Sequence, residues 1–373
     1  GGLWSAFCLY HPMANRKTIY LVLFLSTLFI KGFGQFLYPF NDNFNRFYVF
    51  DNGVFEQLEF QPVDEYFVGN AYLAYFDPRG RFQLYFGGEK HELSLNKPSV
   101  YSTDHFLAYQ FGSQIFLLEG SKLHQIESWA LQEDLWVSDS IVAYNDVYNR
   151  FNVYQADSAQ TLESWNIYTA SISNNSLAYL DINQQLKLFS RGQLYIVWPT
   201  EVTAFTAGQN LVAFQTGIGD LQVWYEDELY TLTYNTNGGF DVSDELVTFY
   251  DDLGGFNVFY QGQTYPLLPY RPLSSELKEN QLVWSDRNGF FFTFYKGEII
   301  RLESYTPDKV TIDNDLLVYQ DINGRLKGFS NGEKFSISSR IATDFDQINQ
   351  AVLYRENRFR WHINIQGEDY TFE

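Results

Sequence analysis

Aspartate recurs along most of the chain at one fixed place in a repeated pattern, and carboxylates in such a series could bind cations or simply hold turns. Each of these residues lies two positions after an aromatic residue that ends an apolar run: Asp42, Asp77, Asp146, Asp181, Asp251, Asp286 and Asp321. An aspartate that opens a tight turn accepts backbone N–H bonds, as expected for Asp321-Ile322-Asn323-Gly324. A ring of such carboxylates would attract cations or a basic partner, and these turns faintly resemble calcium loops. We interpret them as turn-forming, structural residues and predict no metal site.

Aromatic residues form a second recurring series that could bind a ligand. They lie 19 to 21 positions after the same aromatic anchors, in the connection to the next copy: Trp129, Trp165, Trp198, Tyr234, Tyr270 and Tyr305. An aromatic ring can stack on the apolar face of a sugar while nearby carboxylates accept bonds from its hydroxyls. Trp129, Trp165, Trp198, Tyr270 and Tyr305 are therefore candidate ligand-binding residues. Alternatively, these rings wedge between neighbouring copies, and their exposure distinguishes the two interpretations.

Catalytic and metal-binding motifs are not evident in the sequence. There is no Gly-x-Ser-x-Gly, His-Glu-x-x-His or phosphate-binding glycine loop, and the single cysteine is Cys8. His91, His105 and His124 fall on neighbouring copies, but scattered surface histidines are the simpler interpretation. Asp251-Asp252 and Asp244-Glu245 would suit glycoside hydrolysis only if two acids faced each other across a cleft. The sequence thus identifies no catalytic residue, requires no cofactor and favours a non-catalytic protein over an enzyme.

These residues are positioned by a repeat that runs through the chain. The anchors are Phe40, Tyr75, Tyr109, Tyr144, Tyr179, Phe214, Phe249, Trp284, Tyr319 and Tyr354, and successive anchors are 35 residues apart, except for one gap of 34. Self-similarity at 20 to 50 residues is typical of solenoids and propellers. We therefore expect residues 36–373 to form one repeat domain without a linker.

Each copy is predicted to form four short strands joined by tight turns. Adjacent apolar residues occur within a strand, as in Val153-Tyr154 and Val223-Trp224, so both faces of each small sheet require burial. Sheets packed radially provide that burial. The sequence predicts an all-β fold, a β-propeller closed as a single large toroid of nine to ten blades. Two smaller rings or an open superhelical array remain alternatives, and the first copy, which has no room for an opening strand, could borrow one from elsewhere.

The repeats resemble a known family of propellers. In residues 138–146 (SDSIVAYND) and 313–324 (DNDLLVYQDING), a turn containing aspartate precedes an apolar strand, and a polar Asp/Gly turn follows. This pattern is similar to the repeats of TolB-like and WD40-like β-propellers over residues 36–373. The resemblance implies the architecture and assigns no activity.

The first 35 residues predict export. Arg16 and Lys17 follow Met13, and residues 18–30 form an apolar stretch of 13 residues, too short for a membrane span of about 20 residues. We interpret residues 13–35 as a cleaved signal peptide and residues 1–12 as an upstream extension that is not native. The expected location is the bacterial periplasm or the extracellular space, with no membrane span after cleavage.

The negative net charge and the lack of catalytic motifs limit the classes of function that fit the sequence. Acidic residues outnumber basic ones by 45 to 25, giving a formal charge of −20, which disfavours nucleic acid as a partner. The leading expectation is an exported, non-catalytic binding or scaffold propeller that mediates protein–protein interaction. A glycan-binding, lectin-like propeller is the alternative, followed by a propeller-type glycoside hydrolase.

Overall fold

The computed structural model describes residues 36–234, 238–356 and 360–372. Within these ranges the chain forms strands β1 to β39 and no helix, and residues 36–373 make up one compact unit. None of the described segments is a helix long and apolar enough to cross a membrane. The predicted upstream extension (1–12) and signal peptide (13–35) lie outside the described residues.

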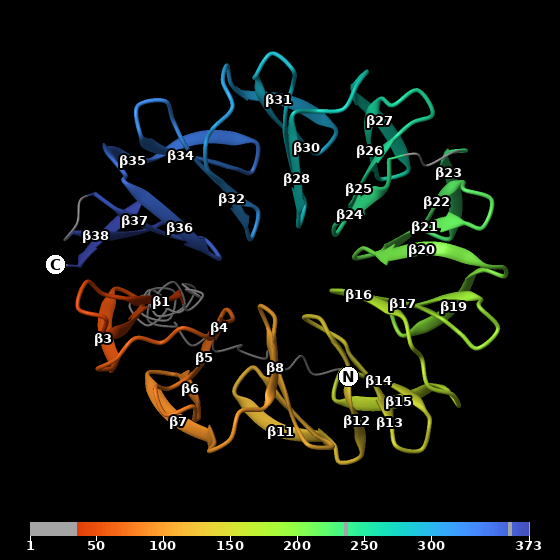
Figure 1. Cartoon of the computed structure of the whole chain (residues 1–373), viewed down its shortest axis with the longest axis horizontal. Helices are drawn as coiled ribbons and strands as arrows, with labels where there is room; N and C mark the ends of the chain where they lie inside the picture. The colour runs from red at the N-terminus through yellow and green to blue at the C-terminus, as the bar shows by residue number, and fades with distance from the viewer. Residues whose placement is uncertain (1–35, 235–237, 357–359, 373) are drawn as a thin grey trace, which may run out of the picture. The chain divides into compact units, whose positions relative to one another are not determined.

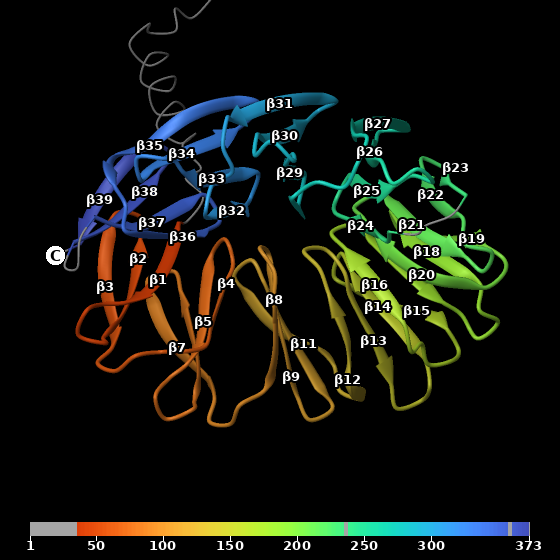
Figure 2. The same ribbon diagram turned by 45° about the horizontal axis from the view of Figure 1, so that its top comes forward.

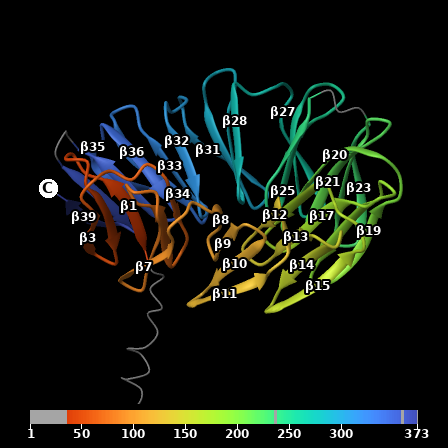
Figure 3. The same cartoon turned by 60° about the horizontal axis from the view of Figure 1, so that its bottom comes forward.

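Ten antiparallel sheets, the blades, follow one another around a ring (Figure 1). Nine blades have four strands in chain order, and the first has three. The innermost strands point toward the centre, whereas the last strand of each blade lies at the circumference, as Figures 1 and 3 show. Turned toward the viewer, the ring is bowl-shaped, with its blades tilted about the central axis (Figure 2). The all-β propeller prediction is confirmed, and the blade number is ten.

The strands fall into four classes by their place in a blade. The innermost strands are β4 (Tyr66–Val68), β8 (Ser99–Ser102), β12 (Ala130–Val137), β16 (Ala170–Ser173), β20 (Val202–Ala207), β24 (Phe240–Val242), β28 (Ser274–Lys278), β32 (Val310–Asp313) and β36 (Asp344–Ile348). The second strands are β1 (Leu37–Asn41), β5 (Tyr72–Phe76), β9 (Phe106–Phe111), β13 (Val142–Asp146), β17 (Ser176–Leu180), β21 (Leu211–Thr216), β25 (Leu246–Tyr250), β29 (Gln281–Ser285), β33 (Leu316–Gln320) and β37 (Ala351–Arg355). The third strands are β2 (Phe47–Asp51), β6 (Phe82–Phe86), β10 (Gln114–Glu119), β14 (Phe151–Gln155), β18 (Leu186–Ser190), β22 (Leu221–Tyr225), β26 (Phe256–Tyr260), β30 (Phe291–Tyr295), β34 (Arg325–Ser330) and β38 (Trp361–Ile365). The outer strands are β3 (Val54–Glu59), β7 (Glu89–Ser94), β11 (Lys122–Glu127), β15 (Ser158–Glu163), β19 (Gln193–Trp198), β23 (Glu228–Thr233), β27 (Gln263–Leu268), β31 (Glu298–Glu303), β35 (Glu333–Ile341) and β39 (Glu368–Phe372).

The aromatic anchors all lie in the second strands, where both faces of the blade are covered. Every residue of β5, β13 and β29 is buried, which explains their unbroken apolar runs. Several anchors also bond the preceding blade: the Tyr179 hydroxyl donates to Glu163 on β15 at 2.8 Å. At Tyr75, Tyr179 and Tyr319 the anchor therefore combines hydrophobic packing with a polar contact between blades.

The ring closes by side-chain packing between its first and last blades. Phe40 lies 5.1 Å, centroid to centroid, from Phe372, and Phe50 lies 4.9 Å from Tyr370. Such aromatic pairs contribute about 0.5 to 1.5 kcal/mol each beyond their burial. Among the described residues no further strand pairs with β1 to β3. The alternative that the first blade borrows a strand is therefore wrong within that part of the chain, because side-chain contacts cover the seam.

Candidate functional site

The recurring aspartates lie in the turns between the second and third strands, on one face of the ring, which we call the turn rim. Asp146 shows the arrangement: its carboxylate accepts bonds from the backbone N–H of Tyr148 at 2.9 Å and of Arg150 at 3.0 Å. The Arg150 guanidinium also donates to it, at 2.8 Å. Burial alone would raise the pKa of Asp146, but these bonds outweigh it and hold the pKa below its usual value.

The same turn recurs around the ring. The pKa of the carboxyl is lowered, against the effect of burial and by bonds from within the turn, at Asp42, Asp77, Asp181 and Asp251 as well. The Asp286 and Asp321 carboxylates accept two backbone N–H bonds each, the first from Asn288 and Phe290 and the second from Asn323 and Arg325. Every carboxylate of the series therefore accepts backbone N–H bonds within its own turn, and Asp181 also pairs with Lys187 on β18.

The candidate aromatic residues separate into two groups by exposure. Trp129 and Trp165 are 57% and 56% exposed, whereas Trp198, Tyr270 and Tyr305 are half-buried. The Arg287 guanidinium lies over the Tyr270 ring, 4.2 Å from its centroid. The Tyr305 hydroxyl accepts a bond from the Ile322 N–H at 3.0 Å, and Trp198 packs 5.4 Å from Phe214. Two of the five residues are therefore open to a ligand, and three are occupied by the fold itself.

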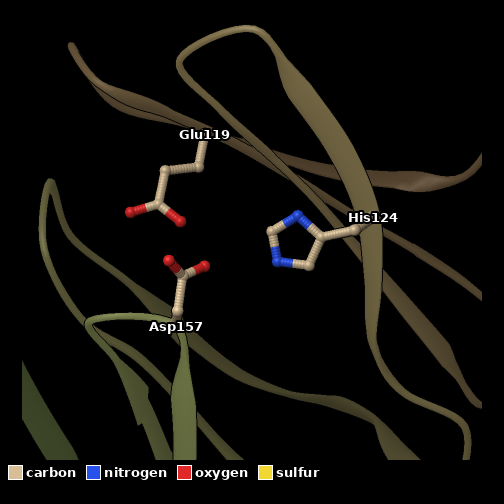
Figure 4. Close-up of side chains that lie close together, drawn as sticks. All are labelled: Glu119, His124 and Asp157. Carbon is tan, nitrogen blue, oxygen red and sulfur yellow. The ribbon is translucent and has the colours of Figure 1, made fainter.

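The histidines of neighbouring copies do not converge. His91 is exposed on β7, His105 lies in the loop after β8, and His124 lies on β11. His124 instead meets two acids, Glu119 at the end of β10 and Asp157 in the turn after β14, with one ligand atom from each within 4.8 Å of the others (Figure 4). The Tyr154 hydroxyl lies 2.9 Å from His124 Nε2 and donates to Asp157 at 3.3 Å. These residue types could hold a metal ion, and in the structure His124 and Asp157 are joined by hydrogen bonds through Tyr154.

The two acid pairs noted in the sequence have separate surroundings. Asp251 accepts bonds from the N–H groups of Leu253 and Gly255 in its own turn, at 2.9 and 2.8 Å. Asp252 accepts a bond from the Thr233 hydroxyl at 2.6 Å. Asp244 lies in a cavity at the centre of the ring. Glu245 lines a different pocket, so Asp244 and Glu245 do not face each other across the central cavity.

That central cavity is the feature that the sequence analysis did not identify. It has a volume of about 660 Å³ and is lined by the loops between the first and second strands of blades two to nine. One position in these loops carries a side-chain oxygen in every blade from the second to the tenth: Asn70, Asp104, Asp139, Asn174, Gln209, Asp244, Glu279, Asn314 and Asn349. This series precedes each aromatic anchor by five residues, so the signal is present in the sequence, although its convergence is visible only in three dimensions.

Neighbouring loops are joined by hydrogen bonds, which fixes the carboxylates around the cavity. The Asn70 N–H donates to the Asp104 carbonyl at 2.8 Å, and the Gln209 N–H donates to the Asp244 carbonyl at 2.7 Å. Side chains take part as well, since Asn314 donates to Asn349 at 2.7 Å. The cavity is therefore built by contacts between blades and requires the closed ring.

The carboxylates of the central cavity repel one another. Burial raises the pKa of Asp104, and the charges of Asp139 and Asp313 raise it further. Burial and the charge of Asp315 likewise raise the pKa of Asp244.

Glu279 shows the strongest effect in the cavity. Burial and the neighbouring Asp313 raise its pKa to about 7, although N–H groups of Asp315 and Asn314 oppose the change. Of the described residues that line the cavity, His105 alone is basic, and Lys278 pairs with Asp313 at 3.2 Å beside it. The cavity is thus a strongly negative site with little internal compensation.

Comparison with solved structures finds chains of low sequence identity. The chain is similar to the designed protein Ika8 (15% identity, TM-score 0.32, covering 71% of this chain and 95% of that one). It is also similar to BamB from Moraxella catarrhalis (11%, 0.35, 69% and 93%) and to the WD40 ectodomain of the receptor kinase ACR4 from Arabidopsis thaliana (6%, 0.33, 64% and 94%). A comparison with curated proteins found no match.

The family of the chain is assigned from a match to a family model. The model of the 10-bladed beta propeller domain matches residues 33–370, which include every strand from β1 to β38. Its blade number is the number of sheets in the structure. The expected likeness to TolB-like and WD40-like propellers is confirmed as an architecture, and the chain belongs to the family of ten-bladed β-propeller domains.

Proposed function

We propose that the protein is an exported, non-catalytic binding module whose central cavity takes up a basic segment of a partner protein. The observation that carries this proposal is the set of carboxylates in the cavity, Asp104, Asp139, Asp244, Glu279 and Asp315, with His105 as the basic group among the described lining residues. A cationic ligand relieves the mutual repulsion of these carboxylates. The repulsion in the free protein therefore favours binding of a cation.

The geometry suits side chains that project from a peptide or loop. Eight blades contribute to the cavity, so carboxylates approach a bound segment from several sides. Arginine or lysine side chains reach such a cavity on long stems and form charge-assisted hydrogen bonds with carboxylates. Propellers commonly act as protein-interaction scaffolds, which agrees with this role but does not identify the partner.

The test uses hexa-arginine as the probe and measures its affinity by calorimetry at low and moderate salt. A triple variant, Asp139→Asn with Asp244→Asn and Glu279→Gln, removes three charges from the cavity. The matched control, Glu89→Gln with Asp227→Asn and Glu333→Gln, removes three exposed charges from outer hairpins. We expect a loss of at least about tenfold for the first variant and less than about twofold for the control. An equal loss in both variants, or no binding by the wild type, would overturn the proposal.

Export is proposed on the sequence alone. The basic pair Arg16 and Lys17 followed by the apolar residues 18–30 supports cleavage near Gln35 and delivery to the periplasm or cell exterior of a bacterium. Expression of the full chain in a bacterial host followed by fractionation and N-terminal sequencing tests this. A protein retained in the cytoplasm with residues 13–35 intact would contradict it.

A further inference from the structure

A pocket on the turn rim, between the fourth and fifth blades, combines two exposed aromatic residues with amide side chains. Its volume is about 270 Å³, and its lining includes Asn149, Trp165, Asn166, Tyr168 and Gln184. We call it the aromatic pocket. From this structure we propose that the aromatic pocket binds a neutral pyranose sugar, stacked on Trp165. The proposal is independent of the central cavity and of its basic ligand.

The aromatic residues of the pocket are unusually open. Trp165 is 56% exposed and Tyr168 is 92% exposed, whereas Tyr144, Phe151 and Tyr154 of the preceding blade are buried. Keeping two such rings in water forgoes about 1.5 to 3 kcal/mol of burial each. A ring face in this position can stack against the C–H face of a pyranose.

At the same repeat position in other blades, the aromatic side chain is covered or bonded by a residue of the next blade. Tyr270 and Tyr305 stand 21 residues after their anchors, as Trp165 does. Arg287 from the next blade covers Tyr270 at 4.2 Å, and the backbone N–H of Ile322 bonds the Tyr305 hydroxyl. The residue that corresponds to Arg287 and Ile322 beside Trp165 is Ile182, which is itself 61% exposed. Trp165 therefore lacks the polar cover that its counterparts have.

The polar lining supplies hydrogen bonds without net charge. Asn166 donates to Asn149 at 3.4 Å, while its own Oδ1 is shielded from solvent and accepts no bond from the described residues. Because water cannot reach this Oδ1, the amide groups open to a sugar hydroxyl are those of Asn149 and Gln184, which are exposed. Asp181 also lines the pocket, but its carboxylate is paired with Lys187 at 3.0 Å. The available groups are therefore amides, which bind hydroxyls as donors and acceptors.

The volume of the aromatic pocket and the net charge of the protein limit the class of sugar further. The volume lies near the lower end of small-ligand pockets, which is about 300 Å³, so the pocket fits one sugar ring rather than an extended chain. The formal charge of −20 disfavours uronic acids and sialic acids by long-range repulsion. A neutral hexopyranose, free or at the end of a glycan, is the ligand class that agrees with both.

The test measures binding of the methyl glycosides of glucose, galactose and mannose, and of N-acetylglucosamine, by saturation-transfer NMR and tryptophan fluorescence. We expect the wild type to bind at least one of them with a Kd of about 1 to 10 mM. Trp165→Ala should weaken binding at least about tenfold, and Trp165→Phe should recover part of it, because a phenyl ring keeps a stacking face.

Phe60→Ala is the control, since Phe60 is an exposed aromatic residue on the connection after the first blade and does not line the pocket. Its affinity should equal that of the wild type, and thermal melts of all variants check folding. The proposal is overturned if no sugar of the panel binds at about 20 mM, or if the folded Trp165→Ala and Phe60→Ala proteins bind equally well. Failure here leaves the hexa-arginine result unaffected, so the two proposals are judged separately.

Discussion

The turn rim and the central cavity use the same side chain in opposite ways. On the turn rim each aspartate accepts bonds from its own turn, and the pKa of the carboxyl is lowered, as at Asp146. In the central cavity the carboxylates face one another, and burial together with their neighbours raises the pKa of Asp104, Asp244 and Glu279. The first set stabilises the fold, whereas the second set destabilises it and is available to a ligand. The environment of a carboxylate, and not its recurrence, therefore indicates function.

The largest expected effect is the loss of a turn aspartate. Asp146→Ala should lower the free energy of unfolding by about 3 to 5 kcal/mol, because it leaves Arg150 and two backbone N–H groups without their acceptor. Urea denaturation measures the change. Asp244→Ala in the central cavity should leave the free energy of unfolding unchanged or raise it. An equal loss of stability in the two variants would contradict the difference between the turn rim and the central cavity.

The next effect is a dependence of stability on pH that comes from Glu279. Its folded-state pKa of about 7 lies above the ordinary value of 4.5, so the folded protein holds the proton more tightly than the unfolded chain. Stability should therefore fall as pH rises from about 5 to 8, by on the order of 2 kcal/mol. Thermal melts recorded between about pH 5 and 8 should show a smaller fall in stability for Glu279→Gln than for the wild type. An unchanged slope would show that burial and the neighbouring Asp313 do not hold the proton on Glu279.

The same proton should affect the binding of the basic probe. Hexa-arginine favours ionised Glu279, so its affinity should rise between pH 6 and pH 8, by about three- to tenfold. Calorimetry in buffers of different ionisation enthalpy should show proton release near pH 7. The Glu279→Gln protein serves as the control, and in it both the rise and the proton release should disappear.

The smallest effect concerns Lys278, a cation beside the cavity. Its ammonium donates to the Ile312 carbonyl at 2.7 Å and pairs with Asp313 at 3.2 Å, and it is largely exposed. Lys278→Met removes this compensation and should tighten hexa-arginine binding by about threefold, with a stability change below about 1 kcal/mol. A weaker complex would indicate that Lys278 positions Asp313 for binding instead of competing with the ligand.

The fold was predictable because its determinants are local and repeated. Each anchor is followed at fixed distances by its turn aspartate and its outer-strand residue, so the strands lie in phase with the anchors from Phe40 to Tyr354. Tight turns and two buried faces left few alternatives to radial packing. Within the described residues the first copy has three strands, as the length left after the predicted cleavage near Gln35 indicates.

The candidate site was less predictable because it depends on contacts between distant copies. Asp104 and Asn314 are hydrogen-bonded at the cavity although 210 residues separate them, since 314 − 104 = 210. Likewise, the sequence places Trp165 and Tyr270 at one repeat position, yet only the structure shows Arg287 covering the second. A search for positions that carry a side-chain oxygen in every copy would have found the ring from Asn70 to Asn349 and left its charge interactions undetermined.

The closure between the first and last blades has a mechanical consequence. Since Phe40 and Phe50 meet Phe372 and Tyr370 through side chains alone, opposed forces on the two ends of the domain would separate this pair of blades before any hydrogen-bonded sheet is broken. Nearly equal repeats also make the cutting point interchangeable. A circular permutant would link the original ends and open the chain at another connection between blades. It would keep its blades, and the pair of blades without a covalent connection would then lie at the new ends.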